Sequence, residues 1–152
     1  MADPIVSPPT LAGFKTWAYA VMGIPTTAMS PEDVGWDYAF TVALDLVPTN
    51  FSGTLSDIYT LTVYNWAGSQ LLQFQQDYVG QTFFADTRKA YGINNFIAGV
   101  VTSASDVSTS ETLAVGRGLQ DLGLLDLQRI KDPYGRQAVA FMQTLGTLWG
   151  IN

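Results

Sequence analysis

Stripes of large apolar side chains at helical spacing, bounded by proline or glycine, limit most strongly what this chain can fold into. In the clearest case, Ser30 and Pro31 predict an N-cap and a first helical position. Glu32 and Asp33 follow, where acidic side chains are favourable to the helix dipole. The apolar stripe then comprises Trp36, Phe40, Ala43, Leu44 and Val47, ending before Pro48. Side chains at this spacing share one helix face, so the segment predicts an amphipathic helix.

Further segments show the same pattern. Residues 11–23 predict a first helix with Thr10 as its N-cap and Pro25 as its stop. Thr82 and Gly92 predict the ends of a short helix, and Ile93 is placed for the hydrophobic contact of a Schellman motif. The segment GLLDLQRIK predicts another short helix, after which Asp132 and Pro133 predict the start of a closing helix. We expect one face of the closing helix to comprise Tyr134, Ala138, Phe141, Met142, Leu145, Leu148 and Trp149.

The segment from Leu55 to Gln76 has two interpretations. Its centre, IYTLTVYNW, is β-branched and aromatic, which would suit a strand in a hairpin. Its apolar residues nevertheless keep a helical register over a length greater than that of an ordinary strand, although Gly68 weakens the middle of a helix. We therefore predict one long helix here, with a hairpin as the alternative.

Length and composition predict a single domain. The chain has 152 residues, 47% of them hydrophobic, which is enough for one sizeable core. We expect a mainly α, single-domain helical bundle with an extended arm at 1–10, a helical part at 11–99, a long polar, β-capable loop or arm at 100–116, and C-terminal helices at 117–152. There is no apolar run of about 18 residues, so no membrane span is expected. The N-terminus lacks the pattern of an export signal, so we expect the protein to stay where it is made or to leave without one.

The sequence contains neither cysteine nor histidine. This excludes thiolate nucleophiles, Ser-His-Asp triads and zinc sites with imidazole or thiolate ligands. The acidic pairs Asp37 with Asp45 and Asp121 with Asp126 could be proposed as acid/base couples, but helix caps and solvated charges explain such residues more simply. The triplet at 116–118, Gly-Arg-Gly, lacks the spacing of a phosphate-binding loop. We therefore expect no enzymatic activity, no catalytic residue, no metal and no cofactor.

Acidic residues are concentrated in the first part of the chain. Residues 1–87 contain eight acids and only Lys15 as a base, whereas residues 88–152 contain six bases and five acids. Such a surface is unsuited to wrapping nucleic acid, which requires clustered lysine and arginine. The four tryptophans, Trp17, Trp36, Trp66 and Trp149, lie on apolar stripes, so we expect them in the core or at buried interfaces rather than on a base-stacking platform.

The stretch VVTSASDVSTSETLAV, residues 100–115, differs from the rest of the chain. Seven of the eleven residues from Thr102 to Thr112 carry hydroxyl groups, so the stretch cannot form core. A disordered surface loop is one interpretation. The other is an extended arm that pairs with a strand of a neighbouring chain, because the rims FIAGVV and TLAV have β character and long loops in compact domains are usually functional. The predicted interface residues are Ile5, Val6, Val100, Val101, Thr102, Ser105, Val107, Thr109, Thr112, Leu113 and Val115.

Several motifs carry a family resemblance. The stretches YTLTVYNWAG, VGQTFFADTRKAYGINNFIAGVV, DPYGRQAVAF and LWGIN resemble small structural proteins from the head and neck of tailed bacteriophages. The likeness runs from Leu55 to the C-terminus. Its most specific parts are Tyr64-Asn65, Gly80-Gln81-Thr82, Phe84-Ala85-Asp86-Thr87-Arg88, Pro133-Tyr134-Gly135-Arg136 and Leu148-Trp149-Gly150.

The resemblance implies a virion protein, assembled in the host cytoplasm, of the head-to-tail adaptor (connector) type. Such adaptors are typically helical, form homo-oligomeric rings between the portal protein and the tail or neck proteins, and reach neighbours with extended arms. DNA would pass through the ring without specific binding. Two alternatives stay open: a decoration or tail-associated virion protein, and a carboxylate-dependent hydrolase acting on the cell wall.

Overall fold

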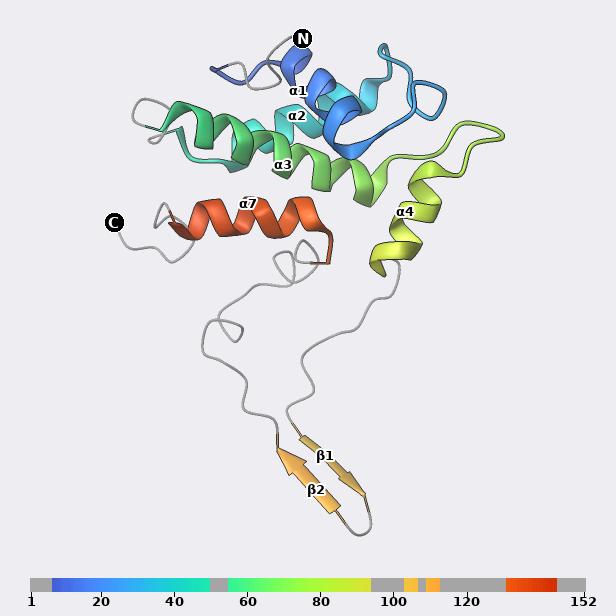
Figure 1. Ribbon diagram of the computed structural model, residues 1–152, viewed down its shortest axis with the longest axis vertical. Coiled ribbons are helices and arrows are strands. Elements are labelled where there is room, and N and C mark those ends of the chain that lie inside the picture. The colour runs from blue at the N-terminus through green and yellow to red at the C-terminus, as the bar shows by residue number, and fades with distance from the viewer. Residues whose placement is uncertain (1–6, 50–54, 94–102, 107–108, 113–130, 145–152) are drawn as a thin grey trace.

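Figure 1 shows the computed structural model of the chain, which describes residues 7–49, 55–93, 103–106, 109–112 and 131–144. A long central helix, α3, lies between α1 and α2 on one side and α7 on the other. The elements, in chain order, are α1 (Leu11–Trp17), the π-helical segment η1 (Ala18–Met22), α2 (Val34–Leu46), α3 (Ser56–Phe74), α4 (Phe83–Tyr91), β1 (Ser103–Asp106), β2 (Thr109–Thr112) and α7 (Pro133–Thr144).

The predicted fold class is confirmed, because the described part of the chain is mainly helical and packs around one hydrophobic core. The long helix expected between Leu55 and Gln76 is present as α3, which rules out the alternative of a hairpin there. Strands occur within the hydroxyl-rich stretch, where β1 and β2 form an antiparallel pair. The short helix predicted for residues 123–131 lies almost wholly outside the described residues.

The first helical segment begins where the sequence predicts. The Thr10 hydroxyl accepts a hydrogen bond from the Gly13 amide at 3.0 Å and so caps α1. After Trp17 the chain continues as η1, a change of helix type that the sequence does not reveal. Gly23 then ends the segment with a left-handed φ of 68°, which only glycine adopts without strain, so the chain turns away before Pro25 is reached.

The start of α2 differs from the prediction, because Asp33 rather than Ser30 is its N-cap. The Asp33 carboxylate accepts a hydrogen bond from the Gly35 amide at 2.8 Å. Ser30 and Pro31 instead open a tight turn, closed by a bond from the Asp33 amide to the Ser30 carbonyl. Proline suits the second position of such a turn as well as it suits the first turn of a helix, so local sequence alone does not separate the two cases.

Helix α3 is enclosed by its neighbours, and every residue from Thr62 to Leu72 is buried. Two of its buried polar side chains bond to the backbone of the helix itself. The Thr62 hydroxyl donates to the Ile58 carbonyl at 2.6 Å, and the Asn65 amide donates to the Leu61 carbonyl at 2.8 Å. Because buried polar groups without partners are costly, these bonds allow a helix with polar residues on several sides to occupy the centre of the fold.

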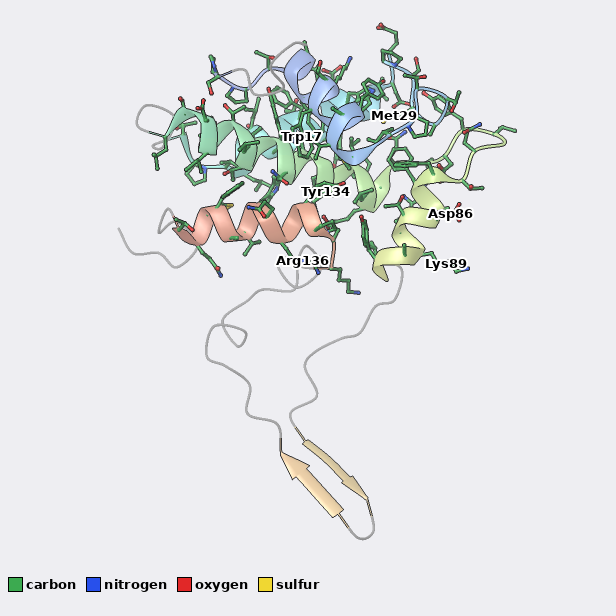
Figure 2. All side chains as sticks on the ribbon, viewed as in Figure 1. Trp17, Met29, Asp86, Lys89, Tyr134 and Arg136 are labelled. Atoms are coloured by element: carbon green, nitrogen blue, oxygen red, sulfur yellow. The ribbon has the colours of Figure 1, made fainter. Side chains whose placement is uncertain are left out.

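Aromatic rings join the layers around α3. Trp17 of α1 lies 5.8 Å from Tyr134 of α7, ring centre to ring centre, and both are labelled in Figure 2. Gly68 lets the Trp17 ring pack closely against α3, since a Cβ at residue 68 would lie 3.1 Å from the Trp17 ring and 2.9 Å from the Met22 sulfur. As predicted, Trp17 and Trp36 are buried in the core. So is Trp66, whereas Trp149 lies outside the described residues.

The N-terminus of α4 is capped by a side chain from the preceding loop. Thr82 occupies the N-cap position, as predicted, but its hydroxyl donates to Asp86 and makes no capping bond. The Asp77 carboxylate accepts from the amides of Phe84 and Ala85, both at 2.8 Å, and supplies the cap instead. At the other end, Gly92 adopts the left-handed conformation and Ile93 donates to the Arg88 carbonyl, which confirms the predicted Schellman motif.

Helix α7 begins at Pro133 with Asp132 as its N-cap, as predicted. The Asp132 carboxylate is fully buried against α3, accepting from the Gly135 amide at 2.7 Å and from the Ser69 hydroxyl at 2.8 Å. Burial raises the pKa of the Asp132 carboxyl above its ordinary value, although these hydrogen bonds and the charge of Arg136 oppose the shift. The cap is therefore also a tertiary link between α7 and α3.

The buried face of α7 is close to the predicted one. Ala138 and Met142 are buried and Tyr134 packs against the core, as expected. Phe141 is only half-buried, and Val139 is buried instead. The predicted face is thus rotated by part of a turn at this point. Leu145, Leu148 and Trp149 lie outside the described residues.

The substitution Gly68→Ala tests the close approach of Trp17 to α3. Alanine gains about 1 kcal/mol of helix propensity over glycine. Overpacking against Trp17 and Met22 costs about 1–3 kcal/mol, so we expect net destabilisation in urea unfolding. The double variant Met22→Ala/Gly68→Ala removes one of the two clashes and should lose less stability than the sum of its single changes. A Gly68→Ala protein more stable than the wild type would contradict this packing.

The substitution Asp132→Asn tests the buried cap of α7. Asparagine keeps an acceptor for the Gly135 amide and cannot ionise. The folded protein raises the pKa of Asp132, so ionisation of this carboxyl is less favourable in the folded than in the unfolded state. The contribution of Asp132 to stability is therefore complete below its unfolded-state pKa and is lost as the pH rises through its folded-state pKa. The free energy of unfolding of Asp132→Asn, relative to the wild type, should therefore increase as the pH rises above about 4, the ordinary pKa of an aspartate. A difference that is independent of pH would show that burial does not perturb this carboxyl.

Candidate functional site

The predicted interface residues that the structure describes lie in a two-stranded hairpin. Ser105 is in β1, and Thr109 and Thr112 are in β2. The register pairs Ser105 with Ser110, Asp106 with Thr109 and Ser103 with Thr112. In Figure 1 the hairpin stands apart from the helical layers. The two strands of the hydroxyl-rich stretch are therefore separated from the helical layers, as their composition differs from that of the helices.

The hairpin has the properties of an incomplete sheet. Each strand has one edge paired with the other strand, and the opposite edge of each carries backbone amides and carbonyls with no strand beside it among the described residues. A lone two-stranded hairpin is at best marginally stable in water, because it has no hydrophobic face to bury. Unpaired strand edges are also the usual templates for pairing with another chain. Both properties favour a role in which a partner adds to the sheet.

The remaining predicted interface residues lie outside the described part of the chain. They are Ile5, Val6, Val100, Val101, Thr102, Val107, Leu113 and Val115. The described end of the N-terminal arm contacts this chain's own helix α3: the Ser7 hydroxyl lies 2.9 Å from the Asp57 carboxylate and 3.0 Å from the Thr60 hydroxyl. Thr10 also bonds to the Tyr64 hydroxyl, so the arm from residue 7 onward follows α3.

The acidic residues considered in the sequence form no shared site in the described structure. Asp37 and Asp45 are both exposed on α2, and the pair Asp121 and Asp126 lies outside the described residues. Within the described ranges, no three histidine, cysteine, aspartate or glutamate side chains gather closely enough to hold a metal ion. No helix among these residues is long and apolar enough to cross a membrane.

A groove between the start of α2 and the end of α3 is a feature that the sequence analysis did not identify. Val34, Tyr38 and Phe74 line it, with a volume of about 500 Å³. The Tyr38 and Phe74 rings pack edge to face with their centres 4.7 Å apart. Val34 is 81% exposed and Tyr38 58% exposed, which is unusual for large apolar residues at neighbouring helix positions. Such a patch is typical of an interaction surface.

Hydrogen bonds around Asp33 hold the wall of this groove. The Tyr78 hydroxyl donates to the Asp33 carboxylate at 2.5 Å, and the Gln75 side-chain amide approaches the same oxygen at 3.4 Å. The bond to Asp33 raises the pKa of the Tyr78 hydroxyl above its ordinary value. Gly35 leaves the space into which Gln75 fits, since a Cβ there would collide with the Gln75 side chain. The groove is therefore built by fixed contacts rather than by loosely packed side chains.

One sequence signal could have revealed the groove. Val34 and Tyr38 are four residues apart, hence on one face of α2, but they do not belong to the stripe of Trp36, Phe40 and Ala43. A second apolar strip on an amphipathic helix indicates a second contact surface. Its partner Phe74 could not be found in this way, because the pairing depends on how α3 crosses α2.

Comparisons of the chain with protein-family models, with curated proteins and with solved structures find no significant match. The candidate surfaces therefore depend on the geometry described above. They are the hairpin of β1 and β2 and the groove beside Asp33.

Proposed function

We propose that this chain is a structural protein of a tailed-bacteriophage virion and forms a ring that acts as a head-to-tail adaptor between the portal and the tail. The motifs between Leu55 and the C-terminus that resemble phage neck proteins suggest this class. The observation that carries the proposal is the hairpin of β1 and β2, an incomplete sheet that stands apart from the helical layers around the described core.

In this proposal the hairpin pairs with a strand of a neighbouring subunit. Backbone hydrogen bonds supply the affinity in this mode of binding, so a strand rich in serine and threonine is adequate. A hairpin without large apolar residues has little tendency to aggregate as a free monomer. Within a ring, neighbours are present at a high effective concentration, which favours pairing only after assembly has begun.

The absence of basic residues from one long segment suits a protein ring through which DNA moves. Residues 16–87 contain no lysine or arginine, and they form α2, α3 and most of the core. Lysine and arginine bind DNA by displacing the counterions of its phosphates. A channel wall without these side chains does not hold DNA in this way. We propose that this part of the ring faces the channel and that the protein performs no chemistry on the DNA.

Substitutions in the hairpin test the proposal. Ser105 and Ser110 face each other across the two strands. Proline at both positions removes two backbone donors and disrupts pairing, whereas alanine at both keeps the backbone intact. We expect the proline variant to enter particles at least about tenfold less efficiently, because the loss of about 1.4 kcal/mol changes binding tenfold. Deletion of residues 102–112 should have the same effect, and incorporation is measured by quantitative mass spectrometry of purified particles.

The alanine variant is the matched control and should be incorporated at the wild-type level. Thermal unfolding followed by circular dichroism should be the same for the proline, alanine and wild-type proteins, since the described core does not include the hairpin. A proline variant that is incorporated normally would contradict the role of strand pairing in assembly.

A further inference from the structure

Most of the positive charge on the described residues lies at one end of the molecule. Lys15 is the exception, and its ammonium group donates to the Pro31 carbonyl at 2.6 Å. The other bases are Arg88, Lys89, Lys131 and Arg136, at the end of α4 and the start of α7. Lys89 and Arg136 are exposed, and Figure 2 shows both on the side of the molecule away from α1 and α2. We name Lys89, Tyr91 and Arg136 the basic surface.

The groove beside Asp33 has the opposite character. Glu32 and Asp37 are exposed and directly adjoin lining residues in the sequence, and Asp33 forms part of the wall. Among the bases of the described residues, Lys15 lies beside this group through its bond to the Pro31 carbonyl, and a single ammonium leaves the three carboxylates of Glu32, Asp33 and Asp37 with a net negative charge. We name Glu32, Val34, Asp37 and Tyr38, together with the wall at Asp33, the acidic groove. It combines exposed apolar area with negative charge, the combination expected of a surface that binds a cationic and aromatic partner.

The acidic groove is ready to bind without rearrangement. Asp33 is held through both carboxylate oxygens, by the Gly35 amide and by the Tyr78 hydroxyl. Tyr38 is held by its contact with Phe74. Surfaces fixed in this way lose little conformational entropy on binding, so the apolar area of Val34 and Tyr38 contributes to affinity with a small ordering cost.

We propose that the acidic groove of one copy binds the basic surface of the next copy in the ring. This inference rests on the proposed function, because it identifies the contact by which that ring forms. Lys89 and Arg136 supply charges complementary to Glu32 and Asp37, and Tyr91, which is 37% exposed, supplies an aromatic ring for the apolar lining. A symmetric contact of groove with groove would place acid against acid, and a contact of basic surface with basic surface would place cation against cation.

The positions of the two surfaces allow one copy to use both at once. The acidic groove lies at α2 and Arg136 lies on α7, and these helices pack on different sides of α3. A contact that joins two different surfaces of the same chain is heterologous, and repeating it produces a closed ring when the rotation between copies divides the circle. The hairpin of β1 and β2 then adds a second link between neighbours that this contact has already brought together.

Charge-reversed variants test the inference. Glu32→Lys/Asp37→Lys changes the groove, and Lys89→Glu/Arg136→Glu changes the basic surface. Native mass spectrometry over a range of concentrations should show oligomers for the wild type. Each variant alone should need a concentration at least about a hundredfold higher to assemble, because like charges then face each other. The equimolar mixture of both variants, and a single chain with all four changes, should recover assembly because every contact is again complementary.

Asp45→Lys is the matched control, since Asp45 is exposed on the same helix and lies outside the groove. It should assemble like the wild type, and both it and Glu32→Lys/Asp37→Lys should unfold at the wild-type temperature within the effect expected of surface charges. Arg136→Glu also reverses a charge that acts on the buried Asp132 carboxyl, so the variants that carry this change should unfold at a somewhat lower temperature, and their assembly is compared below that temperature. Normal assembly of the single-surface variants, or a mixture that stays monomeric, would overturn the inference and leave the adaptor function in place. A wild type that is monomeric at every concentration would also overturn it, whereas the adaptor function is judged separately by the hairpin variants in particles.

Discussion

The enclosure of helix α3 is the constraint on which the rest of the structure depends. From Thr62 to Leu72 the helix has no solvent-facing residue, so each polar side chain needs a partner inside the protein. Thr62 and Asn65 find one in their own helix, and Ser69 finds one in the Asp132 carboxylate that caps α7. Gly68 lets the Trp17 ring approach α3 closely. Side-chain packing, the capping of α7 and the pairing of buried polar groups therefore all depend on α3.

Under the proposed function, this arrangement separates the residues that stabilise the fold from those that mediate assembly. The described core lies within the helical layers, and of the apolar residues that line the groove beside Asp33 only Phe74 packs against it. Strand edges and exposed apolar residues can therefore be kept for contacts with other copies without weakening the fold. The charges follow the same division, with acids around the groove and bases, apart from Lys15, at the end of α4 and the start of α7 among the described residues. A subunit that folds alone and then binds its neighbours in a ring, as proposed, needs contact residues that are not required for its stability.

The sequence predicted the parts of the fold that local patterns determine. The periodicity of α2 and α3, the caps at Thr10 and Asp132 and the stop at Gly92 depend on residues close together in the chain. Where distant residues compete, the sequence was insufficient. Asp33 replaced Ser30 as the cap of α2, and Asp77 capped α4 across a loop. The groove was missed for the same reason, because Phe74 meets Tyr38 only through the crossing of two helices.

The number of copies of this chain in purified particles of the phage proposed to encode it tests the adaptor role most directly. Quantitative mass spectrometry relative to the major capsid protein gives that number. The proposed function predicts the copies of a single ring per particle, because one ring joins the portal to the tail. Hundreds of copies would indicate a decoration or tail-shaft protein instead, and absence from the particle would contradict a structural role in the virion.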